Sequence, residues 1–305
     1  MRRGRELTAT LVAVAVLILV GGAAVVVARR SSKPRRPSGS AASSAVRTVS
    51  IVCSSPALGG TLPAQVYLPP GYSQHGRRYP VIYFLHGLPA GPASYKTNAF
   101  VAGALATTGK QAIVVAPQGA RNSNSDREYL NWSPTENWPQ AIAHDLPTCI
   151  DRHYPTIADR YGRALTGISA GGYGAANIGL RHLATFAAVE SWSGYFAATD
   201  PTGAHVLDLG SAQADRAAAV PSAAQLLAEL KAWPSLIAFY VGRQDSRFLQ
   251  MNEQFATELT EGGVAHTFAT YPGGHSPTLW RAQAPRWLTL AVDDMAAGQR
   301  HRGPH

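Results

Sequence analysis

The chain has 305 residues, a formal net charge of +9 at pH 7 and only two cysteines. Residues 1–45 hold eight Lys and Arg against one Glu, or +7, whereas the other 260 residues hold 19 basic and 17 acidic residues, or +2. The excess charge belongs to one end of the chain and gives no reason to expect a nucleic acid partner. No Cys and His spacing predicts a metal site, and no Gly-rich loop predicts a nucleotide, so no cofactor is expected.

Residues 7–28 form a run of 22 positions without a charge, preceded by three arginines. As a helix the run would just span the ~30 Å hydrocarbon core of a bilayer, and it exceeds the ~7–15 apolar residues usual in a signal peptide. We therefore expect export, with an uncleaved membrane anchor or, alternatively, a cleaved signal. Basic residues flank both ends of the run, so the positive-inside rule leaves its orientation open. The expected location is the cell membrane, with the folded domain extracytoplasmic, or the outside of the cell.

Residues 31–44 are rich in Ser, Pro, Ala and Arg, which predicts a disordered linker. The remaining length suits one α/β domain with a single core. The predicted organisation is a signal or anchor at 1–28, a linker at 29–45, one folded domain at 46–297 and a flexible tail at 298–305. We expect this domain to be a monomer.

Apolar runs bounded by turn residues predict the strands of the domain. An antiparallel hairpin is expected over about 46–67, followed by mainly parallel strands near 81–86, 112–117, 163–168, 187–192, 236–241 and 265–271. Residues 197–233 are predicted to leave the sheet and form a wall of the substrate cleft. The predicted fold class is α/β, with a mainly parallel central sheet and helices on both faces.

The two cysteines lie in an early predicted strand (Cys53) and near the end of a predicted helix over 140–151 (Cys149). In a cytosolic protein the pair would be two buried thiols. Export favours a disulfide between them instead.

The motif Gly167-Ile168-Ser169-Ala170-Gly171 follows an apolar run and precedes a segment of small residues. G-x-S-x-G between a strand and a helix is typical of a sharp turn that displays a nucleophilic serine. The helix start beneath it would supply N–H groups to a developing oxyanion. An ordinary Gly-rich turn is the alternative.

A base and an acid follow the serine in the expected chain order. Asp245 directly follows the predicted strand at 236–241, and His275 follows a Gly-Gly pair after the predicted strand at 265–271. Other carboxylates compete for the role of the acid, and these are Asp208, Asp215, Glu258 and Glu261. The first two do not directly follow a strand-like run, and the last two lie inside a predicted helix.

Upstream, the predicted strand at 81–86 runs into His86-Gly87-Leu88, where a second oxyanion N–H is expected. We expect His86 to shape this loop rather than to carry protons. Ser169, His275 and Asp245 with this loop predict a serine hydrolase of the α/β-hydrolase fold.

Residues 78–87, 167–175 and 274–276 resemble the esterase D superfamily of α/β-hydrolases, which includes feruloyl and acetyl-xylan esterases, S-formylglutathione hydrolases and antigen-85-type mycolyltransferases. The resemblance covers about residues 48–290. It implies a Ser169–Asp245–His275 triad and an oxyanion hole made by the N–H groups of Leu88 and Ala170.

Asn131-Trp132, Asn137-Trp138 and the Trp280 that follows His275-Ser276 are similar to the mycolyltransferase branch. Gly171-Gly172-Tyr173 after the serine, and an Asp as the acid, depart from that branch and favour a general esterase.

Three functions are therefore compared. The first is an extracytoplasmic esterase that acts on a small-molecule, glycan or lipid ester, and the second is an acyltransferase that moves acyl chains onto cell-envelope sugars. The third is a non-catalytic surface binding module. Several side chains could line the cleft, although core packing explains each one equally well, and these are His86, Tyr95, Trp132, Trp138, Tyr173 and Trp280.

Overall fold

The structure, a computed structural model, describes residues 45–120, 128–200 and 205–301. They belong to one compact unit that begins at Ala42. The predicted anchor or signal and nearly all of the linker lie outside the described residues. Within the described ranges, no helix is both long enough and apolar enough to cross a bilayer.

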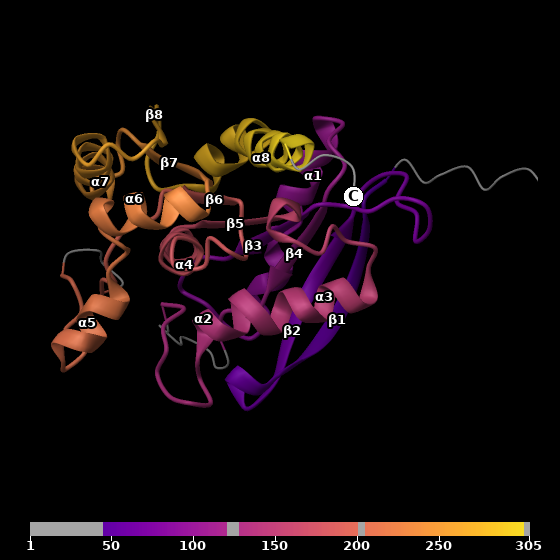
Figure 1. The fold of residues 1–305 in the computed structure, drawn as a ribbon, viewed down its shortest axis with the longest axis horizontal. Coiled ribbons are helices and arrows are strands. Elements are labelled where there is room, and N and C mark those ends of the chain that lie inside the picture. Colours follow the sequence, from indigo (N-terminus) through magenta and orange to yellow (C-terminus); the bar gives the residue numbers. More distant parts are fainter. Residues whose placement is uncertain (1–44, 121–127, 201–204, 302–305) are drawn as a thin grey trace, which may run out of the picture. The chain divides into compact units, whose positions relative to one another are not determined.

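An eight-stranded sheet forms the centre of this unit, with the strand order β1-β2-β4-β3-β5-β6-β7-β8 (Figure 1). Strands β1 and β2 form an antiparallel hairpin, β2 pairs antiparallel with β4, and every later pairing is parallel. The strand bounds are Arg47–Ser55 (β1), Gly60–Leu68 (β2), Val81–Leu85 (β3), Ile113–Pro117 (β4), Arg163–Ile168 (β5), Ala188–Trp192 (β6), Leu236–Gly242 (β7) and Thr267–Tyr271 (β8). The predicted hairpin and parallel strands are confirmed.

The central strands are buried because helices cover both faces of the sheet. Every residue of β3, β4 and β6 is buried, whereas the edge strand β8 is half-buried along its length. Such burial explains why β3 and β4 appear in the sequence as continuous apolar runs without alternation, whereas β6 also buries Glu190 and Ser191.

The helices divide between the two faces (Figure 1). Helices α1 and α8 pack on one face through Val101, Leu105, Trp287 and Leu288, while α3, α4, α6 and α7 pack on the other. The main helix bounds are Ala99–Thr107 (α1), Trp138–Gln140 (α2), Leu146–His153 (α3), Ala170–Gly179 (α4), Ala212–Ala218 (α5), Ala223–Ala232 (α6), Leu249–Glu261 (α7) and Pro277–His301 (α8), and the π-helical turn Ala141–Asp145 joins α2 to α3. Short 3-10 turns cover Pro56–Leu58, Ser94–Asn98 and Arg160–Gly162.

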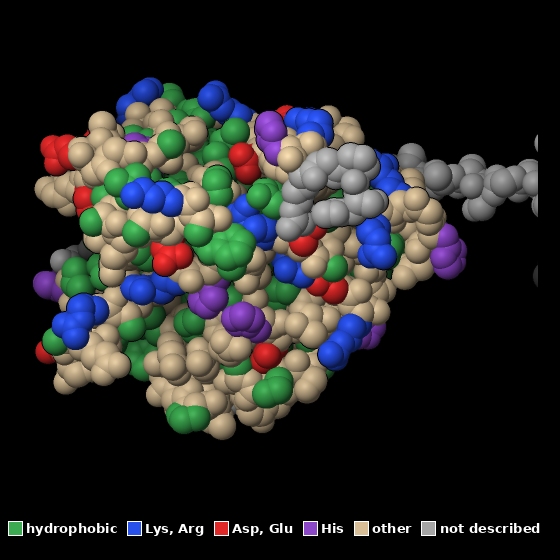
Figure 2. Space-filling view, in the orientation of Figure 1, with side chains coloured by type: hydrophobic (Ala, Val, Ile, Leu, Met, Phe, Trp, Pro, Cys, Tyr) green, Lys and Arg blue, Asp and Glu red, His purple; other side chains and the backbone are tan. Residues whose placement is uncertain are grey.

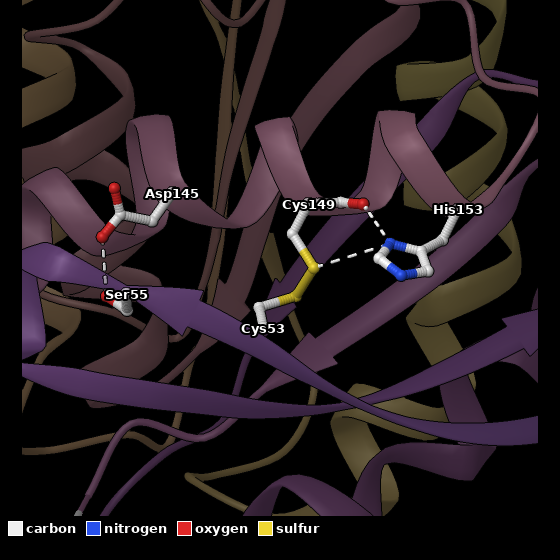
Figure 3. The surroundings of a disulfide bond; sticks show 5 residues. All are labelled: Cys53, Ser55, Asp145, Cys149 and His153. Atoms are coloured by element: carbon white, nitrogen blue, oxygen red, sulfur yellow. Dashed lines mark hydrogen bonds between the residues drawn. A yellow bond between two sulfur atoms is a disulfide. The ribbon is translucent and has the colours of Figure 1, made fainter.

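A disulfide joins the first strand to the helical layer. Cys53 in β1 and Cys149 in α3 are bonded, with their Cα atoms 5.8 Å apart (Figure 3). Beside it, the Ser55 hydroxyl donates to Asp145 Oδ2 at 2.7 Å, a hydrogen bond that joins β1 to the end of the π-helical turn before α3. The predicted disulfide is confirmed.

Two boundary features differ from the sequence prediction or extend it. Helix α8 runs to His301, so part of the segment predicted as a flexible tail is helical, because the basic residues Arg300 and His301 suit a helix C-terminus. The described part of 197–233 includes α5 and α6, and its Ala198, Leu207, Leu209 and Ala218 pack in one cluster with Ala170.

The surface charge matches the near balance of the domain's sequence. On the face that Figure 2 shows, Lys and Arg side chains are interspersed with Asp and Glu rather than gathered in one basic stripe. A stripe of that kind would be the electrostatic signature of a nucleic acid interface.

Candidate active site

Ser169 occupies the turn between β5 and α4 in a left-handed conformation, with φ 54° and ψ −123°. Its N–H donates to the Trp192 carbonyl at 3.0 Å, which ties the turn to the end of β6. Gly171 is required by close approach, since a Cβ there would lie 2.2 Å from the Leu85 carbonyl oxygen. The G-x-S-x-G spacing therefore follows from a turn pressed against β3.

His275 lies between Ser169 and Asp245. Its Nε2 is 2.8 Å from Ser169 Oγ and its Nδ1 is 2.7 Å from Asp245 Oδ2. A neutral imidazole would donate its Nδ1 proton to the carboxylate and accept the serine proton at Nε2. The structure thus brings together the three residues predicted as a triad.

Loops at the carboxyl ends of β7 and β8 hold the acid and the base. Asp245 follows β7, is 2% exposed, and its N–H donates to the Gly242 carbonyl at 3.0 Å. His275 lies between β8 and the start of α8, and its side chain is 12% exposed. Parallel strands place their carboxyl ends at one edge, so residues distant in sequence converge there.

The competing carboxylates have local partners elsewhere. Glu258 Oε1 accepts from the Ala223 N–H, Asp215 Oδ1 from the Leu209 N–H, and Asp208 Oδ1 from the Gly210 N–H. Glu261 ends helix α7. The carboxylate that accepts from His275 Nδ1 is that of Asp245.

The loop after β3 lies against the serine turn. A Cβ at Gly87 would be 3.0 Å from Ser169 Cβ, so Leu88 follows a residue in contact with the turn. Ala170 is the first residue of α4, and the first N–H groups of a helix have no partner within it. Leu88 and Ala170 are thus each one residue from the contact between Gly87 and Ser169, and their role as oxyanion donors stays a prediction.

His86 holds this loop from beneath. It is 3% exposed, its Nε2 accepts from the Gly119 N–H at 2.9 Å, and the Tyr129 hydroxyl donates to its carbonyl at 2.8 Å. Burial lowers the pKa of His86, because desolvation disfavours the charged imidazole. At 3% exposure His86 does not lie open on a cleft, and its role in shaping the loop stays a prediction.

Three aromatic side chains predicted to line the cleft are buried instead. Trp138 packs against Tyr129 in the core, and Tyr173 stacks on Tyr195 with their ring centroids 5.0 Å apart. Tyr95 is buried in the 3-10 turn that precedes α1. Their large apolar surfaces explain this, since a helix or turn that packs on a sheet buries such rings first. Trp132 is 37% exposed in a turn closed by the Asn131–Asn137 bridge.

Trp280 is the predicted cleft residue that lies beside the triad. Its ring is 5.1 Å from the His275 ring at an angle of 89°. Sequence reasoning missed two further neighbours: Phe248, whose ring is 5.3 Å from His275, and Ser193, which accepts a hydrogen bond from Trp280. Their positions, three residues after Asp245 and directly after β6, are the signals that could have identified them.

A metal site is not part of this arrangement: across the described ranges no group of three or more His, Cys, Asp or Glu side chains could hold an ion. The groups in contact at the site are a hydroxyl, an imidazole and a buried carboxylate, joined by two hydrogen bonds.

Comparisons with known proteins identify the family of the chain. The family model described as "Putative esterase" matches residues 55–289. Esterase Rv1288 of Mycobacterium tuberculosis is 25% identical over 244 residues, which cover 72% of this chain and 53% of that protein. The chain thus spans about half the length of the curated relatives it matches.

Solved structures share the fold. A ferulic acid esterase superposes with a TM-score of 0.67 at 23% identity, over 83% of this chain and 99% of that one. The S-formylglutathione hydrolase FrmB of Staphylococcus aureus gives 0.63 at 21% identity, over 81% and 99%. Mycobacterium tuberculosis MPT51 (FbpC1) gives 0.60 at 20% identity, over 83% and 99%. With the family model matching most of the chain, we conclude that this protein belongs to the esterase family of the α/β-hydrolase fold.

Proposed function

We propose that the protein is a serine esterase that hydrolyses carboxylic esters through an acyl-enzyme. The observation that carries this proposal is the pair of hydrogen bonds at His275, 2.8 Å to Ser169 Oγ and 2.7 Å to Asp245 Oδ2. A buried acid, a base and a nucleophile in this order form the minimal apparatus for acyl transfer to serine.

In the first half-reaction, Ser169 Oγ attacks the ester carbonyl while His275 Nε2 takes its proton. Asp245 stabilises the imidazolium and keeps Nδ1 as the donor. The Leu88 and Ala170 N–H groups bind the tetrahedral oxyanion, and the loss of one such donor typically lowers the rate by ~10²–10³. The C–O bond then breaks, and the alcohol leaves with the proton from His275.

In the second half-reaction, His275 takes a proton from water, and the resulting hydroxide equivalent attacks the acyl-enzyme. Collapse of the second tetrahedral intermediate releases the carboxylic acid and returns the proton to Ser169. Each half-reaction thus begins and ends with a neutral imidazole, as general acid–base catalysis requires.

A fluorophosphonate probe tests the proposal directly. Wild-type protein should be labelled at Ser169 and should hydrolyse p-nitrophenyl butyrate, and the Ser169→Ala variant should do neither while keeping its far-UV circular dichroism. A folded wild type that the probe does not label would favour the third function, a non-catalytic binding module.

Hydrolysis is proposed over acyl transfer because Asp245 as the acid, and Gly171-Gly172-Tyr173 after the serine, depart from the mycolyltransferase pattern. Trehalose or glycerol added to the assay separates the two. The free acid should remain the main product, and an acyl-sugar as the main product would assign the acyltransferase function instead.

We also propose an extracytoplasmic location. The Cys53–Cys149 disulfide, which forms and persists in oxidising compartments, and the uncharged run at residues 7–28 support it. Protease added to intact cells that make the full chain should digest the domain if it is anchored outside, and the culture medium should contain it if it is secreted. Protection from protease, with no protein in the medium, would reject the proposal.

A further inference from the structure

Ser193 is a second left-handed serine at the edge of the sheet where the triad lies. It directly follows β6, has a φ of 47°, and is fully buried. Its N–H donates to the Tyr240 carbonyl at 2.7 Å, which fixes it to the end of β7. A non-glycine residue in this conformation carries a free-energy cost, and such residues cluster at functional sites.

The Ser193 side chain accepts a hydrogen bond from a tryptophan. Trp280, in the first turn of α8, donates its indole N–H to Ser193 Oγ at 3.0 Å. The same indole lies edge-to-face with His275 at 5.1 Å. One end of the Trp280 ring is therefore anchored to β6, and its body contacts the base.

His275 has a second aromatic neighbour from a different strand end. Phe248 follows β7, lies 5.3 Å from the imidazole, and itself stacks on Tyr195 at 4.7 Å. Two rings thus bound the imidazole. The Trp280 ring is itself held by a hydrogen bond to Ser193, whereas the Phe248 ring is held by stacking on Tyr195.

We infer that Trp280 is a positioning residue for His275 and that Ser193 sets its position. The inference rests on the proposed esterase function. His275 has to keep two hydrogen bonds while it gains and loses a proton, and reaction rates fall steeply when a base moves by a fraction of an ångström. An indole that the Ser193 hydroxyl holds in place restricts rotation of the imidazole away from Ser169 and Asp245.

The test is a double-mutant cycle on the hydrogen bond. Trp280→Phe retains an aromatic ring and removes the N–H, and Ser193→Ala removes the acceptor. Each should lower both kcat and the rate of fluorophosphonate labelling about tenfold, with KM changed less than twofold. The double variant should be no slower than either single variant, because all three lack the same bond.

Two variants separate positioning from general damage. Ser193→Gly also removes the hydroxyl but suits a positive φ, so it should fold at least as stably as Ser193→Ala and label equally slowly. Trp287 lies in the same helix as Trp280 and also donates its indole N–H to a hydroxyl, that of Tyr271 in β8, at 3.2 Å. Trp287→Phe removes this hydrogen bond and serves as the control. It should lower the urea midpoint and leave the labelling rate of the folded protein unchanged.

Folded Trp280→Phe and Ser193→Ala variants that label at the wild-type rate would overturn the inference, and so would additive effects in the double variant. A Trp287→Phe variant that labels as slowly as Trp280→Phe would also overturn it. Failure of the wild type itself to label would instead count against the proposed function, so the two failures are distinguishable.

Discussion

Two regions of this domain are built on different principles. The carboxyl ends of β5 to β8 carry left-handed serines, a buried carboxylate and backbone contacts that allow no Cβ. The regular edge is the lateral side of the sheet formed by the β1–β2 hairpin, in which nine residues of β1 pair with nine of β2 and a disulfide ties β1 to α3. Strained residues cost about 1–3 kcal/mol each. We infer that the pairing and the disulfide of the regular edge offset the free-energy cost of the strained residues at the reactive edge.

The sharpest way to separate the regions is to remove a reactive group without altering packing. Asp245→Asn should lower kcat by about 10⁴-fold, a loss of the size seen in serine proteases, because the amide favours the wrong imidazole tautomer. KM and the urea midpoint should change little. Steady-state kinetics on p-nitrophenyl butyrate check this, with Ser169→Ala as the inactive reference. An Asp245→Asn enzyme within tenfold of wild type would mean that another carboxylate is the acid.

The regular edge should show the opposite behaviour. A double Cys53→Ser, Cys149→Ser variant should lose about 4–5 kcal/mol of unfolding free energy in the chain-entropy model, since the bridge closes a long loop. Its kcat at 25 °C should match that of wild type as long as it stays folded. Urea unfolding of the variant and of wild type, each with and without reductant, gives the measurement. A kcat that falls in the still-folded variant would show that the regions are coupled.

Glu190 is buried in β6, two residues before the end of the strand, with its Oε2 accepting from Trp192 Nε1 at 3.1 Å. Desolvation raises its pKa well above the usual value, so the folded state keeps the proton to a higher pH than the unfolded chain does. Above the unfolded pKa, each further pH unit therefore costs the folded state up to about 1.4 kcal/mol, until the folded pKa is reached.

Glu190→Gln should therefore match wild type in stability near pH 4 and exceed it increasingly as the pH rises toward the folded pKa of Glu190. Urea unfolding of both proteins from pH 4 to 8 is the measurement, and comparing them removes the contributions of the titratable groups that both proteins share, such as His86. Equal stability at every pH would mean that Glu190 does not carry a proton in the fold.

The sequence allowed prediction of features encoded over a few neighbouring residues. The strand near 81–86 was predictable because burial on both faces favours an unbroken apolar run. The Ser169 turn was predictable because Gly167 and Gly171 are required there, since a Cβ at either would lie 2.2 Å from a backbone oxygen. The burial of Trp138 and Tyr173 was not predictable, since an aromatic residue has the same identity in a core and in a cleft. The contact of Ser193 with Trp280 joins positions 87 residues apart, and no local pattern encodes it.

The Cys53–Cys149 bridge also closes a covalent ring that contains β2, β3, β4 and the His86-Gly87-Leu88 loop but leaves Ser169, Asp245 and His275 outside it. A single cut in the exposed segment 73–78, within the ring, would therefore not release a fragment. The two pieces would migrate as one band on a non-reducing gel and separate only after reduction. Limited proteolysis in that segment would leave a domain that is nicked yet covalently whole, with β1 and β2 held to the rest of it by the disulfide.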